Sequence, residues 1–489
     1  MKKIISIILA CLMLTMVFAS CNVAENTDTE TTATPETTLE ETTIAETDVE
    51  ETTVEDTTEE VTTEKDTAEE TTEEPTEATS EETTTEEETT TEEETLYNIE
   101  GLDIKADDLK DIMQDMFHSG TVKNETVFIL DTDLDGAPKS LLFPIAEIVS
   151  VTNYSGSKVL VEGVDYTVTS DGKLQLLSTT TLRVMKESKY YGTSDTMLQT
   201  VKPDGTVSNT VWGEGNTMTS NQLCVTYKYN TTWEGFEQQS NAQVYEDVIK
   251  KLIAGEDVTF IFYGDSITCG ANSSWFVGVD PSQYSYSMLF TEAIADLFDY
   301  TVNYVDVSHL HNLIKKTPND YVAGTRGTIN FINSAVGGWN TKDGLNNFDK
   351  FVGTYIQQYG CDLLVLAYGM NDGGTSVDSV MNSTKGMIEK AKALAPNVHV
   401  SIVSTMVPNN VSVGGWYGNQ DKQEAPFMEL AASMENVAVT QMTSMSLSIL
   451  EYKAFVDYTG NNINHPNDFF NRVYAQTLFQ SFIGYEYLA

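Results

Sequence analysis

The spacing of hydrophobic residues changes near residue 245. From there to the end, short apolar runs alternate with stretches in which apolar residues recur every three or four positions. The runs predict buried strands and the stretches predict amphipathic helices. This alternation is typical of βαβ units around a parallel sheet, so residues 246–489 predict an α/β domain. The expected strands are 258–263, 302–307, 328–333, 361–368, 398–404 and 436–441, and the expected helices are 245–254, 283–298, 342–358, 376–394, 421–434 and 468–482.

Residues 97–245 show a different pattern, in which short apolar runs are separated by Gly, Ser and Asp. Strand candidates include 126–130, 140–143, 158–161 and 222–227. Short strands between such turns favour a β-sandwich. We therefore expect an accessory β-sandwich domain ahead of the α/β domain.

The N-terminus has the pattern of an export signal. Two lysines precede an apolar stretch, which predicts a secretory signal peptide over residues 1–20. The small residues before Cys21 resemble a bacterial lipobox, in which the cysteine is lipidated; the alternative is a plain signal peptide with an incidental cysteine. No later run reaches the roughly 18 apolar residues of a spanning helix. We expect a lipid anchor on the extracellular face of a bacterial membrane, with no other membrane attachment.

Residues 21–96 are almost entirely Thr and Glu, with Lys65 as the one lysine. Such a segment has too little apolar surface to offset the entropy lost on ordering, which predicts a disordered stalk. It carries about 28 of the chain's 47 net negative charges. The remainder is still acidic, which argues against nucleic acid as a partner.

Four short motifs follow predicted strands or precede a predicted helix in the α/β region. Ser266 follows a strand and a Gly-Asp turn, Gly338 and Asn371 follow two later strands, and His465 precedes the last helix. Acyl transfer needs a nucleophile, a base and donors for the developing oxyanion. Ser266 and His465 fit the first two roles. The backbone N–H groups of Ser266 and Gly338, with the Asn371 amide, fit the third.

This set of residues resembles the SGNH (or GDSL) hydrolase superfamily over about residues 246–489. The resemblance implies a three-layer flavodoxin-like fold and serine esterase chemistry, without a cofactor. The string 264–270, GDSITCG, looks most like carbohydrate-esterase family two, whose members remove acetyl groups from sugars. Esterases resembling this chain can carry an N-terminal jelly-roll-like sandwich, in agreement with the pattern at 97–245.

One position departs from the family pattern. The superfamily usually has an aspartate three residues before the histidine, to orient the imidazole, and this chain has Asn462 there. Three interpretations are open. Asn462 or a backbone carbonyl orients His465 in a Ser-His dyad, which we favour; a remote acid such as Asp457 or Asp468 does so; or the enzyme is weakened.

An acidic loop is a weak candidate for a metal site. Asp131, Asp133 and Asp135 match the first half of a calcium loop, but Leu142 stands where the bidentate glutamate is expected. A plain acidic turn is the better interpretation. The cysteines after the anchor have no metal-ligand spacing and are expected to be buried thiols: Cys224, Cys269 and Cys361.

Trp275 and Trp339 closely follow two of the motifs, and their rings are candidates for stacking on sugar.

Taken together, the motifs, the resemblance and the N-terminal pattern predict a surface-anchored serine esterase that acts on acetylated polysaccharide or another ester. A lipase or thioesterase-type acyl hydrolase remains an alternative, as does a weakened carbohydrate-binding surface protein.

Overall fold

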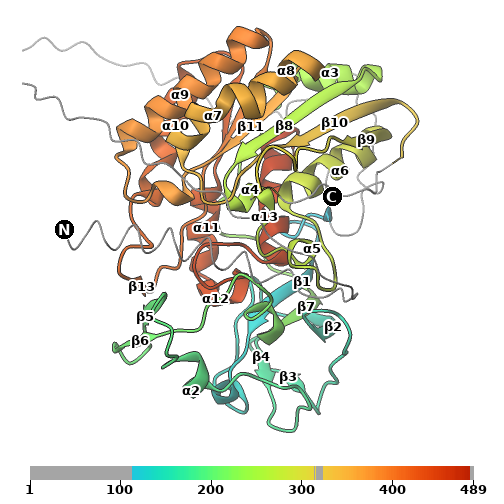
Figure 1. Ribbon diagram of the computed structural model, residues 1–489. Coiled ribbons are helices and arrows are strands. Elements are labelled where there is room, and N and C mark those ends of the chain that lie inside the picture. The colour runs from blue at the N-terminus through green and yellow to red at the C-terminus, as the bar shows by residue number, and fades with distance from the viewer. Residues whose placement is uncertain (1–112, 313, 315–322, 485–489) are drawn as a thin grey trace, which may run out of the picture. The chain divides into compact units, whose positions relative to one another are not determined.

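Residues 113–312, 314 and 323–484 are described by a computed structural model (Figure 1). The expected signal peptide, the anchor at Cys21, the stalk at 21–96 and the first residues of the 97–245 region lie outside the described residues. None of the helices described has both the length and the apolar character needed to cross a bilayer.

The centre of the α/β region is a six-stranded sheet in which all neighbouring strands are parallel. Every residue of the central strand β8 is buried, as expected for a strand covered on both faces. The strand order is β14-β12-β11-β8-β10-β9. The strands are β8 (Val258–Gly264), β9 (Tyr300–Tyr304), β10 (Gly327–Asn333), β11 (Leu363–Ala367), β12 (His399–Val403) and β14 (Val437–Thr440).

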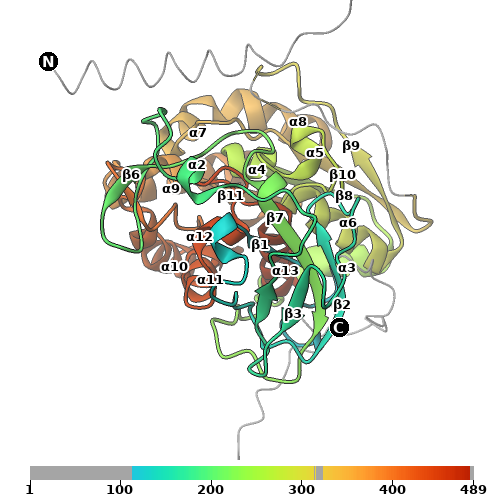
Figure 2. The same cartoon turned by 90° about the horizontal axis from the view of Figure 1, so that it is seen from below.

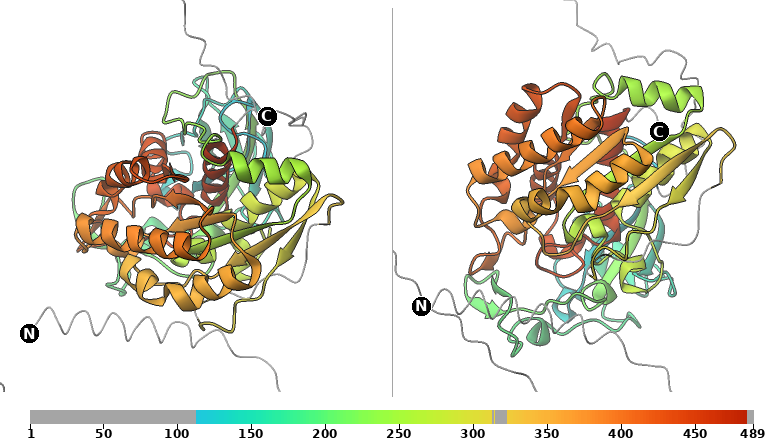
Figure 3. Two further views of the ribbon diagram at one scale, coloured as in Figure 1. Left: turned by 90° about the horizontal axis from the view of Figure 1, so that it is seen from above. Right: turned by 45° about the horizontal axis from the view of Figure 1, so that its top comes forward.

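Helices cover both faces of this sheet (Figure 3). Because successive side chains of a strand point to opposite sides, each strand contributes to the hydrophobic clusters on both faces. Phe260 and Phe262 pack into the cluster with α3 (Glu246–Ala254), α6 (Tyr286–Phe298), α11 (Met442–Leu450) and α13 (Asp468–Phe482). Ile261 and Tyr263 pack into the cluster with α7 (Thr341–Phe348), α8 (Thr354–Tyr359), α9 (Val377–Leu394) and α10 (Glu424–Ala432). The predicted three-layer α/β architecture is confirmed. The flavodoxin strand order is not kept, since β10 lies between β8 and β9.

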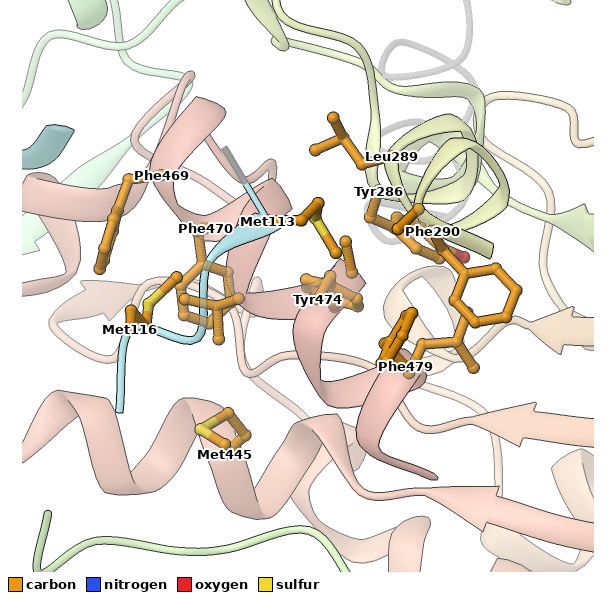
Figure 4. Close-up of a cluster of buried hydrophobic side chains, with 14 of the residues drawn as sticks. Met113, Met116, Tyr286, Leu289, Phe290, Met445, Phe469, Phe470, Tyr474 and Phe479 are labelled. Atoms are coloured by element: carbon orange, nitrogen blue, oxygen red, sulfur yellow. The ribbon is translucent and has the colours of Figure 1, made fainter. Parts of the chain in front are cut away.

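Helix α13 fills the larger core with aromatic side chains (Figure 4). Its Tyr474 ring lies 5.1 Å from that of Tyr286 on α6, and Phe470 lies 4.5 Å from Tyr458. Met113 and Met116, from the start of the described chain, belong to the same cluster. The N-terminal region and the α/β region therefore share one core, and all described residues belong to one compact unit.

The N-terminal region contains small sheets in place of the expected jelly-roll-like sandwich (Figure 2). β1 (Thr121–Phe128), β7 (Gln222–Lys228) and β2 (Glu147–Asn153) form an antiparallel sheet, and β3 (Tyr166–Val168) pairs with β4 (Leu174–Leu176). β5 (Gln199–Val201) pairs with β6 (Val207–Asn209) and with β13 (Ser412–Val413) of the α/β region.

The run 140–143 shows why an apolar pattern in this region predicted a strand that does not form. Leu142 and Phe143 are buried, but their backbone N–H groups donate to Glu125 Oε1 and to the Tyr227 hydroxyl. Side chains thus satisfy backbone groups that a sheet would otherwise pair.

The remaining elements are short. They include α2 (Glu187–Tyr190), α4 (Ser266–Cys269), α5 (Ser274–Val277) and α12 (Phe455–Tyr458). The expected helix at 342–358 appears as α7 and α8 joined by a π-helical turn, Asp349–Gly353. Single 3-10 turns lie at Asp131–Asp133, Thr219–Asn221, Met370–Asp372 and Gln420–Lys422.

Candidate active site

Ser266 is the first residue of α4 and lies at the carboxyl end of the central strand. The Asp265 carboxylate caps this short helix by accepting a hydrogen bond from the Ile267 N–H at 3.0 Å. A Cβ at Gly264 would collide with the Ala367 carbonyl oxygen on the neighbouring strand. The Gly-Asp pair therefore lets the chain turn sharply and leaves Ser266 partly exposed at the sheet edge.

His465 faces Ser266 across the site. Its Nε2 lies 2.9 Å from Ser266 Oγ, and the residue is 7% exposed. The Gly460 N–H donates to the His465 carbonyl at 2.9 Å, and α13 begins at Asp468 with Asn467 as its cap. The structure thus places the predicted nucleophile and base at hydrogen-bond distance.

The other ring nitrogen of His465, Nδ1, has two oxygen neighbours. Asn272 Oδ1 lies at 2.7 Å and Glu214 Oε2 at 2.9 Å. The Asn461 amide nitrogen is also 3.0 Å away, but it has two acceptors of its own, Asn464 Oδ1 and Glu214 Oε1. Because carboxylate and amide oxygens only accept, Nδ1 carries the proton and Nε2 is left free to accept the proton of Ser266.

Glu214, like Asn272, is a site residue that the sequence analysis missed. It belongs to the N-terminal region, and its side chain is 28% exposed. Burial acts to raise the pKa of its carboxyl, but the charge of His465 and hydrogen bonds from His465 and Asn461 outweigh it, so the pKa is lowered. The sequence signal was slight: one acidic residue between two glycines in an irregular segment.

Asn462 does not orient His465, contrary to the interpretation we favoured. Its amide nitrogen donates to the Tyr190 hydroxyl at 3.0 Å and to the Val211 carbonyl at 2.8 Å. Its Oδ1 accepts from Asn409 Nδ2 at 3.1 Å. The residue is fully buried with these partners, so it ties its loop to the N-terminal region.

The two remote acids considered for the same role are also engaged elsewhere. Asp457 accepts a hydrogen bond from the Phe128 N–H at 2.8 Å. Asp468 accepts from the Ser274 N–H at 2.8 Å, and burial raises the pKa of its carboxyl to about 6. Both carboxylates satisfy buried backbone donors.

We expect Asn462→Asp to leave the acidic limb of the kcat/KM profile in place. The new carboxylate would face Tyr190 and Val211, and would lose the two hydrogen bonds that the amide donates. A buried acceptor left facing the Val211 carbonyl should lower the free energy of unfolding by about 1–3 kcal/mol. Thermal unfolding and a pH–rate profile of the variant test both points. A limb that moves to higher pH would return Asn462 to the catalytic assembly.

Two of the three expected oxyanion donors, Gly338 and Asn371, follow the strands adjacent to β8, which are β10 and β11. Residue pairing aligns Ala367 of β11 with Gly264, and the Val336 N–H donates to the Gly264 carbonyl at 3.0 Å. Asn371 Nδ2 donates to the Trp339 carbonyl at 2.9 Å, which joins the two loops and leaves its second N–H available. Gly338 is exposed with φ +81°, a conformation that favours glycine.

Asp372 and Asp265 have structural partners. Asp372 accepts from the Thr341 backbone N–H and hydroxyl, which fixes the start of α7 after the Gly338 loop. Burial raises the pKa of the Asp372 carboxyl, and raises that of Asp265 to about 7. Both carboxylates shape the loops that carry site residues.

The two tryptophans lie beside the motifs and are partly buried. The Trp339 ring packs 4.8 Å from that of Phe351, and the Trp275 ring lies 5.5 Å from Tyr284. Sugar stacking by these rings stays a prediction.

The acidic turn at 131–135 is not arranged to hold calcium. Asp133 pairs with Lys139 at 2.8 Å, Asp131 accepts from the Glu187 N–H, and Asp135 accepts from the Ser178 N–H. Within the described ranges, no group of three or more His, Cys, Asp or Glu side chains is placed to hold a metal ion. The three cysteines are buried, as expected: Cys224, Cys269 and Cys361.

No protein-family model matches the sequence, and no curated protein does. Similar solved structures include a two-domain esterase active on acetylated mannans, with a TM-score of 0.36 and 16% identity over 49% of this chain and 53% of that one. An acetyl xylan esterase has a TM-score of 0.32 and 18% identity, over 46% and 98%. A putative lipolytic protein of the G-D-S-L family from Desulfitobacterium hafniense has 0.31 and 13%, over 46% and 98%. These similarities are distant, and the function proposed below rests on side-chain geometry.

Proposed function

We propose that this protein is a serine esterase in which Ser266 is the nucleophile and His465 the general base. The 2.9 Å contact between Ser266 Oγ and His465 Nε2, at the carboxyl end of the central strand, is the observation that carries the proposal. The oxygen neighbours of Nδ1 support it, because they hold the ring in the tautomer that a base needs.

The mechanism follows from these positions. Ser266 Oγ attacks the ester carbonyl carbon while Nε2 of His465 takes the hydroxyl proton. The backbone N–H groups of Ser266 and Gly338, together with the free N–H of Asn371, stabilise the oxyanion. His465 then gives its proton to the departing alcohol. Water attacks the acyl-enzyme with His465 again as base, which releases the acid and restores Ser266.

Acetylated carbohydrate is the proposed substrate class. The local string around Ser266 resembles carbohydrate esterases that remove acetyl groups, and Trp339 lies next to the proposed oxyanion loop. The apolar N-terminus followed by Cys21 supports a lipid anchor at the outer face of a bacterial membrane, with the Thr/Glu segment as a spacer.

Release of acetate from acetylated polysaccharides tests this proposal. We expect the purified protein to release acetate from at least one acetylated mannan, xylan or peptidoglycan, and to hydrolyse a chromogenic acetate ester. Long-chain acyl esters and acyl thioesters are the comparison substrates. Turnover of the long-chain esters alone would show a lipase, and no turnover of any ester would refute the proposed chemistry.

A further inference from the structure

We infer that Glu214 is the positioning acid of His465, so that the N-terminal region completes the active site of the α/β region. This inference rests on the proposed serine esterase function and deepens it. It assigns to Glu214 the task that an aspartate at position 462 would perform in the superfamily. It also gives the N-terminal region a part in the reaction.

The segment that carries Glu214 is held directly against the loops around the base. The Gly213 N–H donates to the Asn461 carbonyl at 3.2 Å, and Asn272 Nδ2 donates to the Gly215 carbonyl at 3.1 Å. Asn461 Nδ2 lies 3.3 Å from Glu214 Oε1, while Glu214 Oε2 reaches His465 Nδ1. Bonds on both sides of Glu214 therefore fix its carboxylate at the ring.

Asn462 has a place in the same arrangement. It donates to the Val211 carbonyl, three residues before Glu214, and to Tyr190 of the N-terminal region. An aspartate side chain at 462 has no N–H and could donate to neither oxygen. The amide at the usual acid position thus holds the segment that supplies the acid.

A buried ion pair anchors the N-terminal sheet to the α/β region. Lys453 Nζ lies 2.6 Å from Glu125 Oε1 of β1, and both side chains are fully buried. Glu125 also accepts from the Tyr227 hydroxyl of β7 at 2.7 Å. Since an unpaired buried charge is costly, this contact resists separation of the two regions.

Two carboxylates interact electrostatically with the imidazole within this assembly, Glu214 and Asp265. Of these two carboxylates, Glu214 is the one that contacts the ring, and it does so at the nitrogen opposite Ser266. An ionised carboxylate 2.9 Å from Nδ1 attracts the positive charge that the ring gains when it takes the proton of Ser266. Glu214 therefore stabilises the imidazolium that forms as Ser266 attacks.

We expect Glu214→Gln to lower kcat by roughly 10²-fold, with a smaller change in KM. This loss of kcat should be smaller than that of a variant in which the ring also loses the tautomer with the proton on Nδ1. Asn272 Oδ1 still accepts from Nδ1 and keeps that tautomer in place. The acidic limb of kcat/KM should move to lower pH, because the ring then takes its proton less readily. The matched control is Glu147→Gln, which removes an exposed carboxylate paired with Lys228. This control should leave both kcat and the acidic limb of the kcat/KM profile unchanged.

A second variant separates charge from structure. Asn272→Asp in the Glu214→Gln background places a carboxylate at the other acceptor of Nδ1, and gives up the hydrogen bond that Asn272 Nδ2 donates to the Gly215 carbonyl. Asn272 has φ +65°, which aspartate also tolerates. We expect kcat to recover to within roughly tenfold of wild type, and the limb to return. A merely structural role for Glu214 would not be rescued by a carboxylate on another residue.

Titration of the His465 ring by NMR makes the outcome independent of turnover. If Glu214→Gln moves neither the ring titration nor kcat while Ser266→Ala is inactive, the inference is overturned and the esterase proposal stands. If wild type hydrolyses no ester, the esterase proposal fails, and a shifted ring titration still supports the pairing of Glu214 with His465. If Glu214→Gln does not fold, Glu214→Asp decides, because the shorter side chain withdraws the carboxylate from Nδ1: a limb at lower pH is expected, and an unmoved limb contradicts the inference.

Discussion

Ser266→Ala is expected to remove ester hydrolysis almost completely, with kcat falling by about 10⁵–10⁶-fold. The only atom lost is the Oγ that faces His465 Nε2. The fold should be unchanged, since α4 is capped by the Asp265 side chain and the Ser266 carbonyl still accepts from Ala271. Hydrolysis of a chromogenic acetate and thermal unfolding measure the two effects. A phosphonate that labels active serines should modify wild type and leave the variant unlabelled.

Ser273→Ala is the control for this substitution. Ser273 lies in the same loop, is fully buried, and caps α5 by accepting from the Phe276 N–H. Its loss should cost about 1 kcal/mol of unfolding free energy while kcat stays near wild type. Activity in Ser266→Ala above a few per cent of wild type would remove Ser266 as the nucleophile.

The α/β architecture was predictable because its elements obey local rules. Strands buried on both faces give largely apolar runs, so β8, β11, β12 and β14 were found within two residues of their ends. β10 was found equally well, although its polar residues are only partly buried. α11 and α12 were missed. In α11 the serines and threonines break the apolar pattern but are mostly buried, so hydropathy hides the helix.

The N-terminal region was less predictable, because its backbone is satisfied by side chains and by partners distant in sequence. β5 pairs with β13 across more than two hundred residues, and the Phe128 N–H donates to Asp457. No local pattern encodes such contacts.

The difference between local sequence patterns and long-range contacts also explains which site residues were predicted. Ser266, Gly338, Asn371 and His465 each follow a strand or precede a helix, so motif and topology bring them to one sheet edge. Glu214 lies in an irregular segment 251 positions before His465, as their numbering in the sequence gives. Its role depends on how the N-terminal region packs. Asn462 indicated that no acid stands three residues before His465. The sequence did not indicate that Glu214 would lie against the imidazole instead.

Asn371→Ala is expected to lower kcat by roughly 10²–10³-fold, the usual effect of deleting one oxyanion donor. Asn371 projects from the turn after β11, and one of its N–H groups is engaged by the Trp339 carbonyl. The other is the proposed donor to the charge that develops on the carbonyl oxygen. Because this interaction strengthens only in the transition state, kcat and kcat/KM should fall together, as steady-state kinetics on acetate esters would show.

The substitution also removes the bond to Trp339, so loosening of the Gly338 loop needs its own control. Asn340→Ala serves, because the Asn340 side chain caps α7 by accepting from the Asp343 N–H at 3.0 Å and contributes no proposed oxyanion donor. This control should lose about 1 kcal/mol of unfolding free energy and keep kcat within a few-fold of wild type. If both variants lose kcat equally, loop order explains the loss and Asn371 is not a donor. If Asn371→Ala raises KM alone, the amide binds ester and transition state equally, which contradicts an oxyanion role.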